Sequence, residues 1–176
     1  MAEIRVTAPE RLAAQHEVND FTNGVHASLD AWLHDRALAS EGNSARTYVV
    51  CDAAQRQRVV GYYTITTAME QRVALPSAKL RRGMPEQVPL LLVARLAVDA
   101  GFQGIGLGAD LLADALRRCA AASEIVGARA VVVHAIDEKA ATFYARHGFI
   151  ASPLGELVLL LPMESVRPLL DEKSVS

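Results

Sequence analysis

The chain has 176 residues, of which 51% are hydrophobic and 22% charged. That composition predicts one compact globular domain, over residues 1–170, with a sizeable core. The net charge of -2 gives no sign of a nucleic-acid or acidic-membrane partner at the level of the whole chain, although a local patch can still supply one. No window of about 18 apolar residues occurs, which excludes a membrane-spanning helix. We therefore expect a cytoplasmic protein with no membrane partner.

The first half of the chain predicts helical and strand patterns in alternation. Apolar spacing and β-branched residues predict a short strand at 4–6, a helix at 28–39 capped by Ser28 or Asp30, and strands at 46–52 and 58–68. Three prolines and a glycine predict a long surface loop at 75–89. The apolar run at 90–98 predicts a central strand covered on both faces.

The second half predicts a strand, helix, strand crossover. A helix to about residue 122 leads into a buried strand at 128–135, so this strand and the one at 90–98 are expected to pair in parallel. A second helix ends at Gly148, an expected C-cap glycine, and a last strand ends at Pro162. The tail at 171–176 is expected to fray. The fold class that follows is α/β with a mixed sheet.

The segment QGIGLG, residues 103–108, lies between the central strand and its helix. A glycine loop there bares the first amides of a helix, a geometry that binds phosphate. A P-loop is excluded because Ala109 and Asp110 follow Gly108 where a lysine and a hydroxyl are needed. A Rossmann fingerprint is present in form but lies in the wrong context, after hairpin strands. A glycine-rich turn that binds nothing remains an alternative.

Two motifs together resemble those of the GNAT acetyltransferases. The first is Gln103-x-x-Gly106-x-Gly108, and the second is AIDEKAATFYARHGF at 135–149. The resemblance implies an acyl-CoA N-acyltransferase fold with a splayed parallel strand pair, and acetyl-CoA as the acyl donor. It also implies which residues contact the coenzyme: Leu96, Ala97 and Val98 through a strand edge, Gln103, Gly104, Ile105, Gly106, Leu107 and Gly108 through the loop, and Asp137 and Phe143 in the far wall.

A narrower resemblance covers most of the chain. The segments DFTNGVHASLDAWLHDRA (20–37), VVGYYTI (59–65), KLRRGMPEQVPLLLVARLAVD (79–99) and VVVHA (131–135) are similar to the GNAT toxins of bacterial toxin/antitoxin modules. This resemblance implies acetylation of the α-amino group of aminoacyl-tRNA, which blocks translation. It further implies a ribbon-helix-helix antitoxin and a toxin homodimer as partners. The alternatives are an acetyltransferase for a small amine or a protein N-terminus, and a non-catalytic GNAT-like binding protein.

Acetyl transfer to an amine needs a neutral amine, a polarised carbonyl and a proton for the departing thiolate. The resemblance implies that Tyr144 donates this proton, and a phenol with a pKa near 10 stays protonated at cellular pH. A packed aromatic pair with Phe143 is the structural alternative. His134, at a strand end, could serve as a base, but a lone histidine there is more often a satisfied core residue. His26 and His34 lack the spacing of a zinc site, so we expect no metal.

A local excess of positive charge lies between Gln71 and Arg95. This segment contains five basic residues and one acidic residue, Glu86, which gives a local net charge of +4. On charge alone a solvated loop and an RNA contact are about equally expected. The toxin resemblance favours RNA, so the expected tRNA-binding residues are Arg72, Lys79, Arg81, Arg82 and Arg95. The two cysteines, Cys51 and Cys119, form no metal or disulfide pattern and are expected to be free buried thiols.

Overall fold

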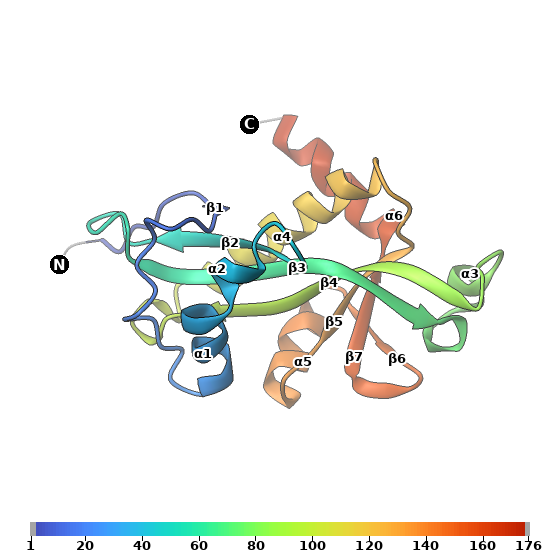
Figure 1. Cartoon of the computed structure of the whole chain (residues 1–176). Helices are drawn as coiled ribbons and strands as arrows, with labels where there is room; N and C mark the ends of the chain where they lie inside the picture. The colour runs from blue at the N-terminus through green and yellow to red at the C-terminus, as the bar shows by residue number, and fades with distance from the viewer. Residues whose placement is uncertain (1–2, 175–176) are drawn as a thin grey trace. The chain divides into compact units, whose positions relative to one another are not determined.

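The structure is a computed structural model that describes residues 3–174 (Figure 1). Its elements follow one another as β1 (Glu10–Arg11), α1 (Ala27–Asp35), α2 (Ala37–Ser40), β2 (Arg46–Cys51), β3 (Val59–Gln71), η1 (Arg72–Ala74), α3 (Ala78–Arg81), β4 (Gln87–Val98), η2 (Ala100–Phe102), α4 (Leu107–Ser123), β5 (Ala130–His134), α5 (Glu138–Arg146), β6 (Ile150–Ser152), β7 (Gly155–Pro162), α6 (Met163–Val166) and η3 (Arg167–Ser174). No helix of the described residues is long and apolar enough to cross a membrane.

The strands form one mixed sheet in the order β1-β2-β3-β4-β5-β7-β6. β4 and β5 run parallel, whereas β2 and β3, and β5 and β7, run antiparallel. The expected fold class, with its parallel strand pair, is confirmed. Contacts between Cα atoms divide the chain into two compact units, and β3, β4 and α4 contribute to both. The first unit is Met1–Ile65 with Arg95–Ala115, and the second is Thr66–Ala94 with Leu116–Ser176.

The core of the first unit forms around Tyr62 on β3. The ring of Phe21 meets the Tyr62 ring edge-on at 5.5 Å, and the Trp32 ring stacks on it at 6.1 Å. The Tyr62 hydroxyl donates a hydrogen bond of 2.7 Å to the carbonyl of Leu29 on α1. α1 is therefore joined to β3 by both apolar packing and a satisfied polar group, which is what a buried tyrosine requires.

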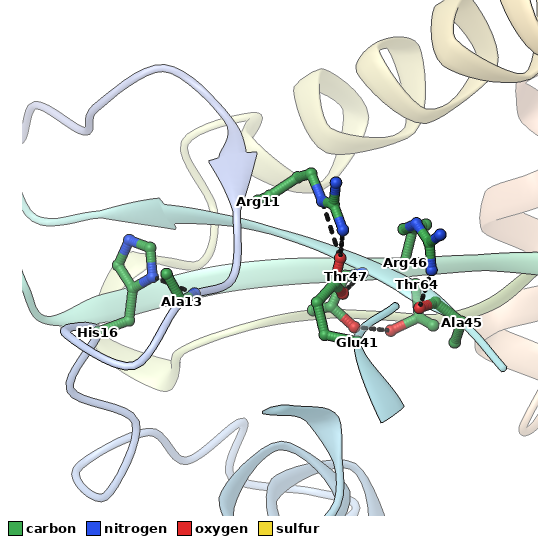
Figure 2. A network of polar contacts seen from close by, with 8 residues as sticks. All are labelled: Arg11, Ala13, His16, Glu41, Ala45, Arg46, Thr47 and Thr64. Carbon is green, nitrogen blue, oxygen red and sulfur yellow. Dashed lines mark hydrogen bonds and ion pairs between the residues drawn. The ribbon is translucent and has the colours of Figure 1, made fainter. Parts of the chain in front are cut away.

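A chain of polar contacts also ties the N-terminal segment of the first unit to its strands (Figure 2). The Arg11 guanidinium donates to one carboxylate oxygen of Glu41, and the other oxygen accepts the backbone N–H of Thr47 at 2.8 Å. The Thr47 hydroxyl lies 3.0 Å from the Thr64 hydroxyl inside the sheet. The Glu41 carboxylate thereby joins the Arg11 side chain of β1 to the backbone of β2.

The core of the second unit joins the sheet to the segment 72–86, which we call the basic segment. Leu75 and Leu80 from that segment are buried with Val88, Leu90, Ala130, Val132 and Leu160. The expectation of a long surface loop at 75–89 was therefore wrong. Ser77 caps α3 by accepting the N–H of Leu80, and each buried leucine contributes about 1.5–3 kcal/mol, so tertiary burial outweighs the local prolines and glycine.

The expected helix at 28–39 is divided at Arg36, whose backbone leaves the helical region. Neither Ser28 nor Asp30 is the N-cap residue, so that expectation was also wrong. The N-cap of α1 is His26, and the side-chain oxygen of Asn23 accepts the N–H groups of Val25 and His26. Asn23 is held in this position because the Asp30 carboxylate accepts hydrogen bonds from its side-chain and backbone N–H groups.

Both ends of the chain differ from the expected elements. The expected strand at 4–6 is reduced to a single bridge from Val6 to Asp52, and β1 lies later, at Glu10–Arg11. β6 was not expected, and it pairs with β7 as an added edge strand. η3 covers residues 171–174 of the tail, while 175 and 176 lie outside the described residues.

Candidate active site

Two glycines give the loop before α4 a backbone that other residues rarely adopt. Gly104 and Gly106 have φ of 80° and 85°, whereas Gly108 is helical within α4. A Cβ built on Gly104 or Gly106 would meet no described atom within 4 Å. Conformation rather than crowding therefore requires glycine at both positions, and the space in front of the loop is open.

This loop presents the N-terminus of a 17-residue helix. The N–H of Asp110 donates to the Gly106 carbonyl at 3.1 Å, so the amides of residues 107–109 precede the first helical bond. Leu107 is 5% exposed and anchors the helix start, while Ile105 is 49% exposed on the loop. Free amides and the positive end of the helix dipole suit a phosphate group at this position.

Two polar side chains fix the loop to the end of β4. Asp99, only 3% exposed, accepts the N–H of Thr22 with one carboxylate oxygen and that of Gly101 with the other. The Gln103 side-chain amide donates to the carbonyls of Asn23 and Val98, at 2.8 and 2.9 Å. These two hydrogen bonds use the Gln103 side chain to hold the loop in place within the first unit. The sequence motif did not reveal this structural role of Gln103. Asp99 was not singled out from the sequence at all.

A third glycine sets how closely α4 approaches β3. A Cβ on Gly61 would lie 2.9 Å from Cγ2 of Val50 and 3.1 Å from Cδ1 of Leu111. Both neighbours are core side chains that are close to fully buried. Only a residue without a side chain lets the first turns of α4 rest on the sheet here, which places the loop amides at the end of β4.

The parallel ladder between β4 and β5 is short. It pairs Leu91 with Val131, Leu92 with Val132 and Val93 with Val133, and β4 then continues to Val98. Among the described residues, β5 offers no ladder partner to 94–98. The residues expected to meet the coenzyme arm, Leu96, Ala97 and Val98, lie in this continuation. A strand that runs past the end of its ladder has backbone groups available to an extended ligand.

Tyr144 is held at the end of α5 by a Schellman motif. The N–H of Phe149 donates to the Tyr144 carbonyl at 3.2 Å, and the N–H of Gly148 donates to the Ala145 carbonyl at 3.1 Å. Gly148 has φ of 93°, which confirms it as the C-cap glycine, and the Phe149 ring lies 5.5 Å from the Tyr144 ring. The glycine, the two backbone bonds and the ring contact together fix the position of Tyr144.

The Tyr144 side chain is buried in the second unit, but its hydroxyl oxygen is not among the fully enclosed, unpaired polar atoms of the described residues. The side chain is 7% exposed, yet no hydrogen bond joins its hydroxyl to any residue within 3–174. The other buried tyrosines are satisfied, because Tyr62 donates to Leu29 and Tyr63 to Asp114. Burial raises the pKa of Tyr144 to about 12, so its proton stays on the oxygen at neutral pH. An unpaired, protonated phenol is a hydrogen-bond donor held ready for a ligand.

Two further expected coenzyme residues belong to α5 and its N-cap. The half-buried Phe143 ring meets the Tyr144 ring edge-on at 5.2 Å and lies 4.7 Å from the ring of His147. Asp137 is the N-cap of α5, and one of its carboxylate oxygens accepts the N–H of Ala140 at 2.8 Å. Asp137 thus has a structural task whether or not a coenzyme is bound.

The basic side chains of the second unit differ in how free they are. Arg72 donates to the Met84 carbonyl and Arg81 to the Leu75 carbonyl, so both brace the basic segment. Lys79 is exposed. Burial raises the pKa of Glu164, but hydrogen bonds to its carboxylate, the charge of Arg129 and the smaller effect of Lys79 together lower it. Arg82 is exposed, and its side chain forms no hydrogen bond or ion pair with any residue within 3–174. Arg82 and Lys79 are the better placed of the four for an external phosphate.

Arg95, in the first unit, has a different environment. Its guanidinium lies 4.3 Å from the centre of the Trp32 ring, a cation–π geometry. Partial burial lowers the pKa of Arg95, and the neighbouring Tyr62 opposes this shift. The guanidinium is stacked rather than paired with a carboxylate, so its planar edge can still donate hydrogen bonds.

The described residues bring together one set of side chains with metal-ligating atoms, Glu10, His16 and Cys51, within 4.8 Å of one another. The Ala13 N–H donates to Nδ1 of His16 (Figure 2), so the ring proton lies on Nε2, which faces Glu10 at 2.8 Å. A metal would need the Nε2 lone pair that this tautomer lacks. Burial, then the charge of Glu10, raises the pKa of the Cys51 thiol to about 11, which further disfavours a metal thiolate. The set is a structural hydrogen-bonded cluster.

The described strands form a mixed sheet with a short parallel ladder, and a glycine loop precedes a helix of 17 residues, an order of elements typical of N-acyltransferases. A family model for the acetyltransferase (GNAT) domain matches residues 43–151. The chain therefore belongs to the GNAT acetyltransferase family and is an acetyltransferase.

Individual relatives narrow this similarity. The chain is 40% identical to a tRNA-acetylating toxin of Mycobacterium tuberculosis over 168 residues, 94% of this chain and 98% of that protein. It also resembles the structure of AtaT complexed with acetyl-methionyl-tRNAfMet, with 32% identity, a TM-score of 0.85, and coverage of 94% and 99% of the two chains. A mutant AtaT toxin bound to the C-terminus of the antitoxin AtaR and acetyl-CoA matches with 30% identity, a TM-score of 0.77, and coverage of 95% and 99%.

Proposed function

We propose that this chain is a toxin that transfers the acetyl group of acetyl-CoA to the α-amino group of aminoacyl-tRNA and so blocks translation. The observation that carries the proposal is the buried Tyr144 side chain whose hydroxyl has no partner among residues 3–174. The extent of the similarity to a tRNA-acetylating toxin supports the choice of acceptor. The two units would form a single GNAT domain over residues 1–170.

In this proposal, acetyl-CoA binds along the first unit's loop and strand. The pyrophosphate accepts hydrogen bonds from the amides of the glycine loop, residues 103–108, and of the helix start behind it. The pantetheine arm pairs with the backbone of Leu96, Ala97 and Val98, where β5 offers no ladder partner. Phe143 and Asp137 line the coenzyme pocket. The acetyl-CoA present in the AtaT structure supports the identity of the donor.

Acetyl transfer then needs two groups from the chain. A backbone N–H of β4 near Leu96 donates to the oxyanion that develops on the thioester carbonyl, an interaction often worth about 3 kcal/mol. The Tyr144 hydroxyl donates its proton to the thiolate as the C–S bond breaks. General acid catalysis of this kind contributes roughly 10²- to 10⁴-fold to the rate.

The acceptor is bound by charge and by its amine. Arg95 and the basic segment, with Arg72, Lys79, Arg81 and Arg82, meet phosphates of the tRNA, and the exposed Arg82 and Lys79 contribute most of the direct contacts. A ribbon-helix-helix antitoxin and a second copy of the toxin are the proposed partners. The antitoxin bound to AtaT supports the choice of an antitoxin as partner. Because charged tRNA is cytoplasmic, the proposal also puts the chain in the cytoplasm.

Labelled acetyl-CoA in a cell-free translation reaction tests the function. The label is expected in the RNA fraction, and mild alkali is expected to release it as an N-acetyl amino acid, because alkali cleaves the aminoacyl ester but not the amide. Translation is expected to stop in parallel. Label in a protein or in a small amine, with translation unaffected, contradicts the proposal and favours the alternative acceptors.

Charge reversal tests the RNA contact. Arg82→Glu is expected to weaken tRNA binding and to reduce the slope of log K against log salt concentration by about 1. Arg5→Glu is the matched control, because Arg5 is an exposed arginine in the first unit whose nearest charged partner is Glu3. An equal effect of both variants, or of neither, contradicts a contact at Arg82.

A further inference from the structure

His134 lies where the parallel ladder of the second unit ends. Val133 is the last β5 residue paired with β4, and His134 follows it directly as the last residue of β5. The His134 side chain is 53% exposed. The sequence-based view of a satisfied core histidine is therefore wrong, and the ring is accessible to a ligand at the point where β5 stops pairing with β4.

Among the described residues, the imidazole forms one contact with a charged side chain, that of Glu70 on β3. Its Nε2 lies 3.4 Å from Oε1 of Glu70, whose side chain is 24% exposed. A carboxylate can only accept, so Nε2 carries the proton in this contact and Nδ1 has the free lone pair. β7 presents the apolar Val158 opposite His134, and the carboxylate of Asp137 caps α5. A carboxylate behind a histidine sets which ring nitrogen carries the proton and leaves the other nitrogen to accept one, the arrangement of a general base.

Strand alternation sets the face on which this ring lies. Ala130 and Val132 are buried against Leu75 and Leu80 of the basic segment. His134 follows them with a period of two, so it lies on the same face of the sheet as that segment. α5, which carries Tyr144, packs on the other face, where Gly148 adjoins Leu161. A base on one face and an acid on the other suit a reaction in which the acceptor and the leaving group lie on opposite sides.

We propose that His134, held by Glu70, accepts the proton of the acceptor's α-ammonium group; this role rests on the proposed function. Nδ1 takes one proton and leaves the electron pair on nitrogen, which forms the C–N bond to the acetyl carbon. The C–S bond breaks and the thiolate takes a proton from Tyr144. The second amine proton restores the Tyr144 phenol through solvent, and His134 releases its proton to water. One proton is released for each acetyl group transferred.

The test compares His134→Gln with the wild-type chain at two pH values, using purified aminoacyl-tRNA and labelled acetyl-CoA. Glutamine keeps an N–H near the position of Nε2, so it preserves the tie to Glu70 but cannot accept a proton. An ordinary α-amino group is about one-fifteenth neutral at pH 6.5 and mostly neutral at pH 8.5. The variant is therefore expected to lose roughly tenfold in kcat/KM at pH 6.5 and less than about twofold at pH 8.5.

A second pair of variants separates charge from structure. Glu70→Gln is expected to lose activity in the same direction as His134→Gln but less, because an amide can both donate and accept and so fixes the ring tautomer less strictly than a carboxylate. Glu3→Gln, which disrupts an exposed ion pair with Arg5 in the first unit, is the matched control and is expected to leave kcat/KM unchanged. Thermal unfolding and acetyl-CoA binding of all three variants are expected to match the wild-type chain.

The outcomes are distinguishable. A His134→Gln variant that matches wild-type activity at both pH values, or that loses the same factor at both, overturns the proton-transfer role while the proposed function stands. A wild-type chain that places no label on aminoacyl-tRNA overturns the proposed function and this role with it. A loss confined to low pH, shared in part by Glu70→Gln, supports the role.

Discussion

Tyr144→Phe removes a single hydroxyl, and the structure sets two expectations for it. Because no described residue bonds to that hydroxyl, the substitution breaks no hydrogen bond in the free protein. The Tyr144 oxygen is also not one of the fully enclosed, unpaired polar atoms of the described residues, so its removal is expected to change the free energy of unfolding by less than about 1 kcal/mol. The same change is expected to lower kcat by roughly 10²- to 10⁴-fold.

Tyr63→Phe is the matched control, because it is the same chemical change at another buried tyrosine. The Tyr63 hydroxyl donates to the buried Asp114 carboxylate, so its loss is expected to cost about 1–3 kcal/mol. That cost corresponds to a fall in Tm of roughly 2–12 °C for a chain of this size. Thermal unfolding and release of the CoA thiol measure the two effects. Full turnover by Tyr144→Phe, or a fall in its Tm like that of Tyr63→Phe, would refute the reasoning.

Three other predictions concern the same site. Gly148→Ala places a side chain at a φ of 93° and is expected to lower the free energy of unfolding by about 1–2 kcal/mol. It is also expected to lower kcat by displacing Tyr144. A normal kcat would show that the Schellman motif does not position Tyr144. Gln103→Leu is expected to raise KM for acetyl-CoA several-fold with kcat nearly unchanged, checked by steady-state kinetics, and an unchanged KM would contradict the brace. Because the pKa of Tyr144 is raised to about 12, the stability that its neutral form contributes is complete below pH 10 and is lost between pH 10 and 12, by about 3 kcal/mol. Unfolding titrations should show a smaller alkaline loss for Tyr144→Phe than for the wild-type chain.

Local patterns were sufficient for the elements that surround the site. The glycine that ends α5 was predicted as a C-cap, and its φ of 93° confirms this prediction. The glycine loop at 103–108 was predicted to open a helix, and α4 begins within it at Leu107. The apolar runs of β4 and β5 predicted a parallel pair, which the register confirms. These features depend on residues that are close together in the chain.

The features that the sequence did not reveal depend on distant partners. No neighbouring residue in the sequence indicates that Leu75 and Leu80 are buried against β5. The prolines and the glycine of that segment therefore led to the prediction of a surface loop. The contact between His134 and Glu70 joins residues 64 positions apart, and without it the histidine looked like a core residue. The absence of a partner for the Tyr144 hydroxyl is likewise a property of the folded chain.

The short ladder between β4 and β5 also bears on the lifetime of the protein. Beyond Val93 one edge of β4 has no ladder partner on β5 among the described residues, so an extended ligand on that edge would complete the sheet. A ligand that binds only the folded chain adds about 2.7 kcal/mol to its stability at a concentration of 100 times Kd. The enzyme would then be more stable against unfolding in cells rich in acetyl-CoA than in starved cells. The acetyl-CoA concentration would therefore influence how quickly proteases degrade it.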